Sequence, residues 1–210
     1  MKRRGILIVV SGFSGVGKGT LMNALLKKYD EYALSISATT RQAREGEQEG
    51  KSYFFKSVEQ FEKMIARAEL IEYANYVGNY YGTPRSYVDE QLDAGKDVIL
   101  EIELQGALKI KKEFPETLML FITTSNVNDL IQRLVTRGTE SAEVIRSRMR
   151  RALEEAQDMA CYDYVIINDD LKTCVEDLHQ VIQAEHRRTI RNEELITKIQ
   201  KDLEENVKGE

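Results

Sequence analysis

Residues 12–20, with the sequence GFSGVGKGT, constrain the fold of this chain most strongly. Residues 6–10 before them are an unbroken run of β-forming side chains, typical of a strand buried on both faces. Residues 20–29 after them repeat apolar side chains at helical spacing. In such a strand–loop–helix unit the glycines let backbone N–H groups point at phosphate oxygens, and the helix N-terminus adds partial positive charge. We therefore predict that residues 12–20 bind the phosphates of a nucleotide.

The end of this loop departs from the usual phosphate-loop pattern, in which Ser or Thr follows the lysine. Here Gly19 follows Lys18, and Thr20 comes one place later. We expect the loop to work, because its cradle is backbone and Lys18 can still reach the β- and γ-phosphates, while the hydroxyl on the magnesium side moves to Thr20. The same G-K-G-T ending occurs in adenylate-kinase-like loops, which the stretch resembles. The alternative, a glycine-rich turn with a chance lysine, is disfavoured by the strand and helix around it.

Composition narrows the class of protein. The chain has 210 residues, of which 42% are hydrophobic and 31% charged, as expected for a soluble globular protein with one sizeable core. Its net charge of −5 argues against nucleic acid as the main partner. The chain has no stretch near the roughly 20 apolar residues of a membrane span. Cys161 and Cys174 lack disulfide or metal spacing, so we expect buried free thiols and a cytoplasmic location.

The parallel-sheet pattern recurs along the chain. Apolar strands are predicted at residues 97–102, 118–122 and 164–167, each preceded by a helix, at residues 86–93, 105–114 and 142–159. In open sheets of this kind, ligands bind beyond the carboxyl ends of the strands. We therefore expect the residues that follow the strands to cluster there: Gly12, Glu101, Thr123 and Asn168.

Two segments interrupt this rhythm. Residues 38–84 are rich in Gly, Tyr and charge, and predict a small inserted domain with short antiparallel strands at residues 53–55, 70–73 and 76–77 and a helix at 61–68. Residues 126–154 carry a dense group of arginines, which favours a lid that grips anions over a solvated, ion-paired helix face. The tail, residues 186–210, repeats apolar residues at helical spacing. Such a helix would pack on the body or on a second copy of the chain, which would make a homo-oligomer.

Residues 39–55, TTRQAREGEQEGKSYFF, resemble the guanylate kinase signature T-[ST]-R-x2-[KR]-x2-[DE]-x2-G-x2-Y position for position. GNYYGT (78–83), EIELQG (101–106), RGTES (137–141) and NDD (168–170) resemble further blocks of that family, in the same order and spacing. The resemblance covers about residues 5–185. It implies an α/β fold with a P-loop NTPase-type parallel sheet flanked by helices (core residues 1–37, 85–125 and 155–185), a small inserted GMP-binding domain (38–84) and a helical lid (126–154).

The resemblance also implies the reaction and its residues. The reaction would be ATP-dependent phosphorylation of GMP, and of dGMP, with Mg²⁺, for guanine nucleotide synthesis and recycling. Lys18, Arg137 and Arg148 would be catalytic. ATP would contact the loop and one later residue, namely Gly12, Phe13, Ser14, Gly15, Val16, Gly17, Lys18, Gly19, Thr20 and Asn168, with Thr20 near the metal. GMP would contact Ser37, Arg41, Arg44, Glu47, Tyr53, Glu72, Tyr81, Thr83, Glu101 and Glu103.

Elementary chemistry agrees with these assignments. Arg41 and Arg44 offer forked donors for a phosphate. Guanine presents N1–H and N2–H₂ side by side, and the carboxylate of Glu72 can accept from both. Glu101 and Glu103 stand where the family usually has aspartates, so their roles are open. Two other classes remain: a non-catalytic peptide-binding module on the same fold, and a kinase for another small molecule such as a ribose phosphate.

Overall fold

The computed structural model describes residues 3–76, 78–136 and 142–208. Its larger sheet has five parallel strands in the order β2–β7–β1–β8–β9, with bounds β1 Leu7–Gly12, β2 Tyr32–Leu34, β7 Asp97–Glu101, β8 Leu118–Thr123 and β9 Tyr164–Ile167. The predicted strands are all present, and β2 is an addition that the sequence pattern missed. A strand of three residues is too short to show a period.

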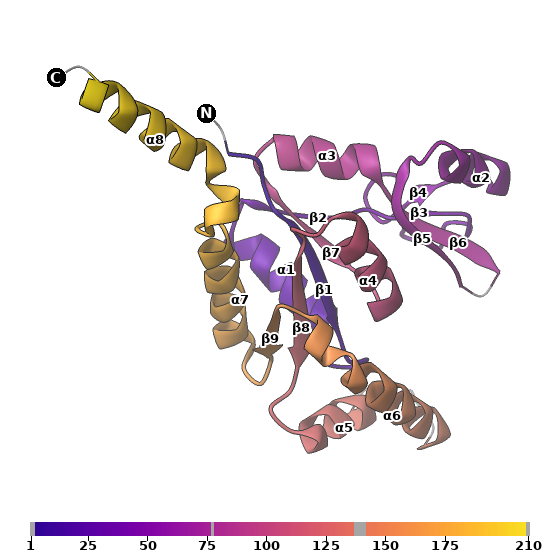
Figure 1. Cartoon of the computed structure of the whole chain (residues 1–210). Coiled ribbons are helices and arrows are strands. Elements are labelled where there is room, and N and C mark those ends of the chain that lie inside the picture. The colour runs from indigo at the N-terminus through magenta and orange to yellow at the C-terminus, as the bar shows by residue number, and fades with distance from the viewer. Residues whose placement is uncertain (1–2, 77, 137–141, 209–210) are drawn as a thin grey trace.

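Helices cover both faces of this sheet (Figure 1). α1 (Lys18–Lys28) packs against α7 (Leu171–Glu185) on one face, and α3 (Arg85–Asp93) and α4 (Leu104–Glu113) lie on the other. The central strands supply fully buried residues such as Val9, Ile99 and Leu120, which form the middle of the core. Burial on both faces explains why these strands are continuous apolar runs.

The inserted segment forms a second sheet in the order β4–β3–β6–β5, with bounds β3 Ala38–Thr39, β4 Phe54–Phe55, β5 Leu70–Tyr76 and β6 Asn79–Pro84. The β3–β6 and β5–β6 pairs are antiparallel, as expected for this domain, but β3 and β4 are parallel, so the all-antiparallel prediction is wrong there. Residues 40–53 between them are long enough for the crossover that parallel strands need. The separate strands predicted at residues 70–73 and 76–77 form one strand, β5, as far as Tyr76, with residue 77 outside the described residues, and the sequence pattern missed β3 and β6.

The helix of this domain, α2 (Val58–Ala66), begins and ends earlier than the predicted range of 61–68. A capping box sets its start: Ser57 Oγ accepts from Gln60 N at 3.1 Å, and Gln60 Oε1 accepts from Ser57 N at 2.9 Å. It ends before Ala68, whose φ of 53° is incompatible with a right-handed helix.

The next helices, α5 (Val127–Thr136) and α6 (Ala142–Gln157), stand at the end of the sheet where β1 and β8 finish (Figure 1). The helix predicted to reach residue 159 stops at Gln157 and is followed by the 3₁₀ turn η1 (Met159–Cys161). Cys161 lies in that turn and is exposed, so the prediction of a buried thiol is right for Cys174 and wrong for Cys161. The turn precedes the edge strand β9, of which only Ile166 is buried.

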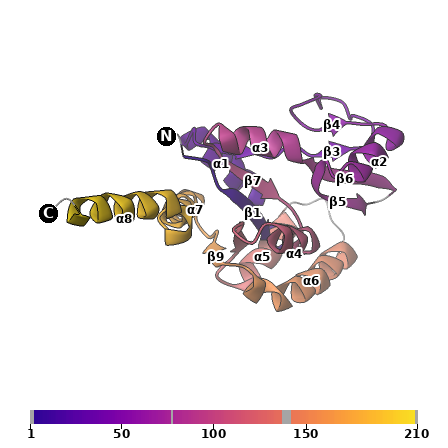
Figure 2. The same ribbon diagram turned by 45° about the horizontal axis from the view of Figure 1, so that its top comes forward.

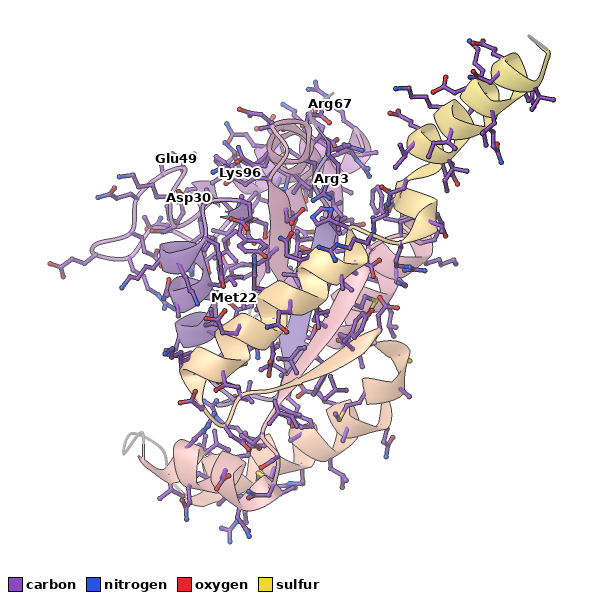
Figure 3. All side chains as sticks on the ribbon, turned by 90° about the vertical axis from the view of Figure 1, so that its left-hand side faces the viewer. Arg3, Met22, Asp30, Glu49, Arg67 and Lys96 are labelled. Carbon is purple, nitrogen blue, oxygen red and sulfur yellow. The ribbon has the colours of Figure 1, made fainter. Side chains whose placement is uncertain are left out.

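The chain continues through η2 (Thr189–Arg191) into α8 (Glu193–Lys208), which projects away from the body (Figures 1 and 3). An apolar stripe runs along it and is exposed: Leu195, Ile196, Ile199, Leu203 and Val207. Beside the base of α8, a cavity of about 1040 Å³ is lined by Arg3, Ile190 and Leu195 among others. It lies at the end of the sheet opposite the phosphate loop. Across the described ranges no helix combines the length and apolarity needed to cross a membrane.

Candidate active site

The loop predicted to bind phosphate joins β1 to α1, with Lys18 as the first residue of the helix. Gly15 and Gly17 have φ angles of 89° and 94°, a region that glycine enters without steric cost. A Cβ on Gly15 would also lie 2.6 Å from Leu134 Cδ2 of α5. Lys18 Nζ donates to Gly12 O at 2.7 Å, so its ammonium group curls back over the loop. The local sequence therefore builds a tight backbone cradle with its cation inside.

The residues that follow the strands do meet at one edge, as predicted. In the sheet register, Val10 pairs with Glu101, and Thr123 pairs with Ile167, the residue before Asn168. Asn168 is buried, and its Nδ2 donates to Val16 O of the loop at 2.9 Å. Desolvation raises the pKa of Glu101, while the charge of Lys18 opposes that rise. Asn168 thus holds the loop by a hydrogen bond, and the carboxylate of Glu101 lies near Lys18.

The end of the loop is open at the position where it departs from the usual pattern. A Cβ on Gly19 would meet nothing within 4 Å, so a side chain would fit there. Thr20 is the third residue of α1 and is exposed. Its hydroxyl is therefore accessible at the N-terminal turn of the helix.

Two arginines connect α5 and α6 to the loop. Arg148 of α6 donates a short hydrogen bond to Ser14 Oγ, so this predicted lid residue does lie at the cradle. Arg133 of α5 donates to Val16 O at 3.0 Å and to Asn168 O at 2.6 Å. The sequence analysis counted Arg133 only as one member of a basic group, because nothing in its spacing indicates that it hydrogen-bonds to the phosphate loop. Arg137 lies outside the described residues.

The inserted domain brings together a second cationic group, which we call the Arg41 cluster: Arg41, Arg44, Glu47, Tyr53 and Tyr81. Arg41 Nη2 contacts both oxygens of Glu47, at 2.8 and 3.0 Å, and Glu47 also accepts the backbone N–H of Arg44 at 2.8 Å. The hydrogen bonds from Arg41 and from the Arg44 backbone lower the pKa of Glu47. The Arg41 guanidinium lies 5.3 Å from the centre of the Tyr53 ring, which is 6.2 Å from the Tyr81 ring. Donors of the kind that bind phosphate are therefore brought together, with Glu47 holding the guanidinium of Arg41 and the backbone of Arg44.

Glu72 and Thr83 lie across from each other on β5 and β6. Thr83 Oγ1 donates to Glu72 Oε1 at 2.9 Å, and burial raises the pKa of this carboxyl group. A Cβ on Gly106, in the first turn of α4, would lie 3.6 Å from Glu72 Oε2. The carboxylate therefore faces the start of α4, where little water competes for it.

Two predicted GMP residues are not joined to these clusters by their side chains. Ser37 is half-buried just before β3, and its backbone carbonyl accepts from Phe54 N at 2.9 Å. Glu103 is the N-cap of α4, and its carboxylate lies 2.6 Å from Arg151 of α6. Glu103 therefore points toward α6.

A phosphate loop on a parallel sheet, a separate group of phosphate-type donors on a second small sheet and helices that contact the loop define a P-loop kinase that acts on a small phosphorylated acceptor. The guanylate kinase family profile matches residues 4–185. The chain is 52% identical over 192 residues to a guanylate kinase of Streptococcus thermophilus, which covers 91% of this chain and 92% of the relative. It is 48% identical over 205 residues to that of Bacillus subtilis, with coverage of 97% and 99%.

A solved structure agrees with these relatives. The crystal structure of guanylate kinase from Anaplasma phagocytophilum matches with a TM-score of 0.69 and 32% sequence identity, and the match covers 90% of each chain. The chain belongs to the guanylate kinase family.

Proposed function

We propose that this guanylate kinase, an ATP:GMP phosphotransferase, holds ATP in the loop of residues 12–20 and GMP against the inserted domain. The observation that carries the proposal is that the chain builds two separate cationic sites, the Lys18 loop and the Arg41 cluster, together with a half-buried carboxylate at Glu72. One site suits the phosphoryl donor and the other the phosphate of the acceptor. A peptide-binding module would need neither.

Guanine recognition is assigned to Glu72 and Thr83. A carboxylate accepts both guanine donors, N1–H and N2–H₂, whereas adenine offers no such pair. The Thr83 hydroxyl holds one carboxylate oxygen at 2.9 Å and leaves the other to face the start of α4. A ribose phosphate without a base would offer no donor to the second oxygen of this half-buried carboxylate, which disfavours that substrate class.

The chemistry of the transfer is positioning and charge neutralisation, because phosphoryl transfer passes through a loose transition state. Lys18 neutralises the β/γ oxygens of ATP, and Arg148 reaches the same loop from the lid. The Arg41 cluster holds the acceptor phosphate for in-line attack, with Glu47 fixing the guanidinium plane. Water is excluded as the helices close over the site, so that ATP is not hydrolysed.

Magnesium fits the donor set at the mouth of the loop. Mg²⁺ usually keeps several waters and binds through substrate phosphates plus one or two oxygen ligands. The exposed Thr20 hydroxyl and the Glu101 carboxylate at the adjacent strand end are such ligands. Within the described residues no group of three or more His, Cys, Asp or Glu could hold a metal by itself, which agrees with an ion that depends on the nucleotide. When bound, Mg²⁺ would neutralise phosphate oxygens.

A coupled assay of ADP release tests the acceptor. We expect turnover with GMP and dGMP, because the contacts assigned here involve the base and the phosphate and not the 2′-hydroxyl, and weak or no turnover with AMP and UMP. Equal turnover of AMP would remove the role given to Glu72. No turnover of dGMP would require a ribose contact that this assignment lacks.

The apolar stripe of α8 supports self-association. A lone 16-residue helix gains little stability in water without packing of its apolar face. The stripe and the cavity at its base share Leu195, so a two-fold pair could bury each stripe in the cavity of the partner. We expect a dimer mass in sedimentation that changing both Ile199 and Leu203 to Glu converts to a monomer, while Lys201→Glu on the polar side does not. A wild-type monomer at micromolar concentration would refute self-association.

The free cysteines and the substrates favour a cytoplasmic location. Cys161 and Cys174 are both free, and Cys161 is exposed. Exposed thiols persist in a reducing compartment, and ATP and GMP are intracellular metabolites, so we assign the protein to the cytoplasm. Fractionation that recovers it outside the cytoplasm would overturn this.

A further inference from the structure

The lid helix α6 is anchored at two points on the same side. Arg148 reaches Ser14 of the phosphate loop, and Arg151 lies three residues further along the helix. Residues three apart on a helix project from neighbouring positions on one face. The position of Arg151 therefore constrains the part of α6 that presents Arg148.

Arg151 crosses from the lid to another part of the protein. Its Nη2 lies 2.6 Å from Glu103 Oε2, at the N-cap of α4, and its Nε lies 3.1 Å from Glu155 in its own helix. The charge of Glu103 is the largest contribution that raises the pKa of Arg151. A cavity of about 710 Å³ separates α4 from α6, with Glu103, Leu104 and Arg151 among its lining residues. The ion pair therefore spans the space between the two helices.

The start of α4 is the meeting point of three parts of the molecule. It follows Glu101 at the end of β7, it faces Glu72 of the inserted domain through Gly106, and it carries Glu103 toward the lid. Figure 2 shows α4 between β5 of the inserted domain and α6. An attachment at Glu103 therefore ties α6 to an element that also meets β7 and the inserted domain.

We propose that Arg151 is a positioning residue, whose ion pair with Glu103 anchors α6 to the start of α4 and so keeps Arg148 over the phosphate loop. The inference rests on the proposed role of Arg148 in phosphoryl transfer. Arg151 itself touches neither the loop nor the Arg41 cluster by any contact that the described residues show. It acts through Arg148, so its loss should lower kcat and leave the KM for GMP nearly unchanged.

The test is steady-state kinetics with GMP for Arg151→Gln, Glu103→Gln and the double variant, at about 50 mM and about 500 mM salt. The side chains of the pair are 49% and 73% exposed, so the effect should have the size of an exposed ion pair, about two- to five-fold in kcat at low salt. Salt screens exposed charges, so the difference from wild type should shrink at the higher concentration. Arg151→Lys should retain most of the wild-type kcat.

The double-mutant cycle separates the anchor from any direct role of Glu103 at guanine. A direct role appears in the KM for GMP of Glu103→Gln, whereas the anchor appears as coupling in kcat, with the double variant losing no more than Arg151→Gln alone. Glu155→Gln is the matched control, since it removes the other partner of Arg151 without touching the bridge to α4. It should keep the wild-type kcat.

Arg148→Ala separates failure of this inference from failure of the lid assignment. If Arg148→Ala loses kcat and Arg151→Gln does not, the anchor is refuted while the role of Arg148 stands. Independent effects of Arg151 and Glu103, or an equal loss in Glu155→Gln, also refute it. If Arg148→Ala keeps the wild-type kcat, the role of Arg148 in phosphoryl transfer is refuted, and the anchoring role of Arg151 is refuted with it.

Discussion

Glu72→Gln is the sharpest test of guanine recognition. The substitution preserves size and lets one oxygen still accept from Thr83, which now donates to Glu72 Oε1 at 2.9 Å. The other end becomes an NH₂ group that faces guanine donors. Loss of a charged hydrogen bond, with an unpaired donor left in its place, costs about 2–4 kcal/mol. This corresponds to a fall in kcat/KM for GMP of about thirty-fold to several hundred-fold.

A comparison of two acceptors shows whether this loss arises from recognition of the guanine base. kcat/KM is measured for GMP and AMP with both proteins, because AMP gains nothing from the carboxylate and should change little. The GMP/AMP ratio should therefore fall by nearly the whole factor. Thermal melting of both proteins controls for a fold defect. An unchanged ratio would refute the assignment of Glu72 to the base and direct attention to Thr83 with Glu101.

Three further outcomes are expected. Lys18→Ala should lower kcat/KM by more than about tenfold, or 1.4 kcal/mol, without loss of folded structure in circular dichroism, since the ammonium group lies in the loop and not in the core. Thr20→Ala should raise the Mg²⁺ concentration needed for half-maximal rate, whereas Gly19→Ser, which has room for its side chain, should not; identical titrations would make Thr20 a helix-start residue only. Burial raises the pKa of Glu72, and guanine binds its charged form, so acidification through that pKa should raise the KM for GMP. Glu72→Gln should lack this component, and parallel pH profiles would contradict the coupling.

Much of the fold follows from local patterns. The strand, glycine turn and helix of residues 7–28 are short-range features of the sequence. The continuous apolar runs of β7 and β8 predict strands that are buried on both faces. Parallel strands share one carboxyl edge, so the meeting of Glu101, Thr123 and Asn168 there could be predicted from the order of elements alone. The errors include the three-residue β2, which is too short to show a period, and the inserted domain, where β6 was missed and β3 pairs with β4 in parallel.

The chemical character proposed for the site also comes from its residues. Arginines and tyrosines in residues 39–53 predict anion binding, and the family blocks point to Glu72 as a reader of guanine. The side-chain contacts within the site, by contrast, could not be predicted from the sequence. Nothing in the spacing shows that Glu47 holds Arg41, or that Glu103 turns to Arg151, because both contacts depend on which rotamers the packed backbone permits.

Only the tertiary structure decided the neighbours that are remote in sequence. Arg133 reaches the loop 117 residues away at Val16, and Thr83 is brought to Glu72 by the β5–β6 pairing. The apolar stripe of α8 was visible as a pattern, but its projection away from the body was not. The physical reason is common to all three: periodicity records that a face is apolar or charged, while the identity of what meets that face is set by how separate elements pack.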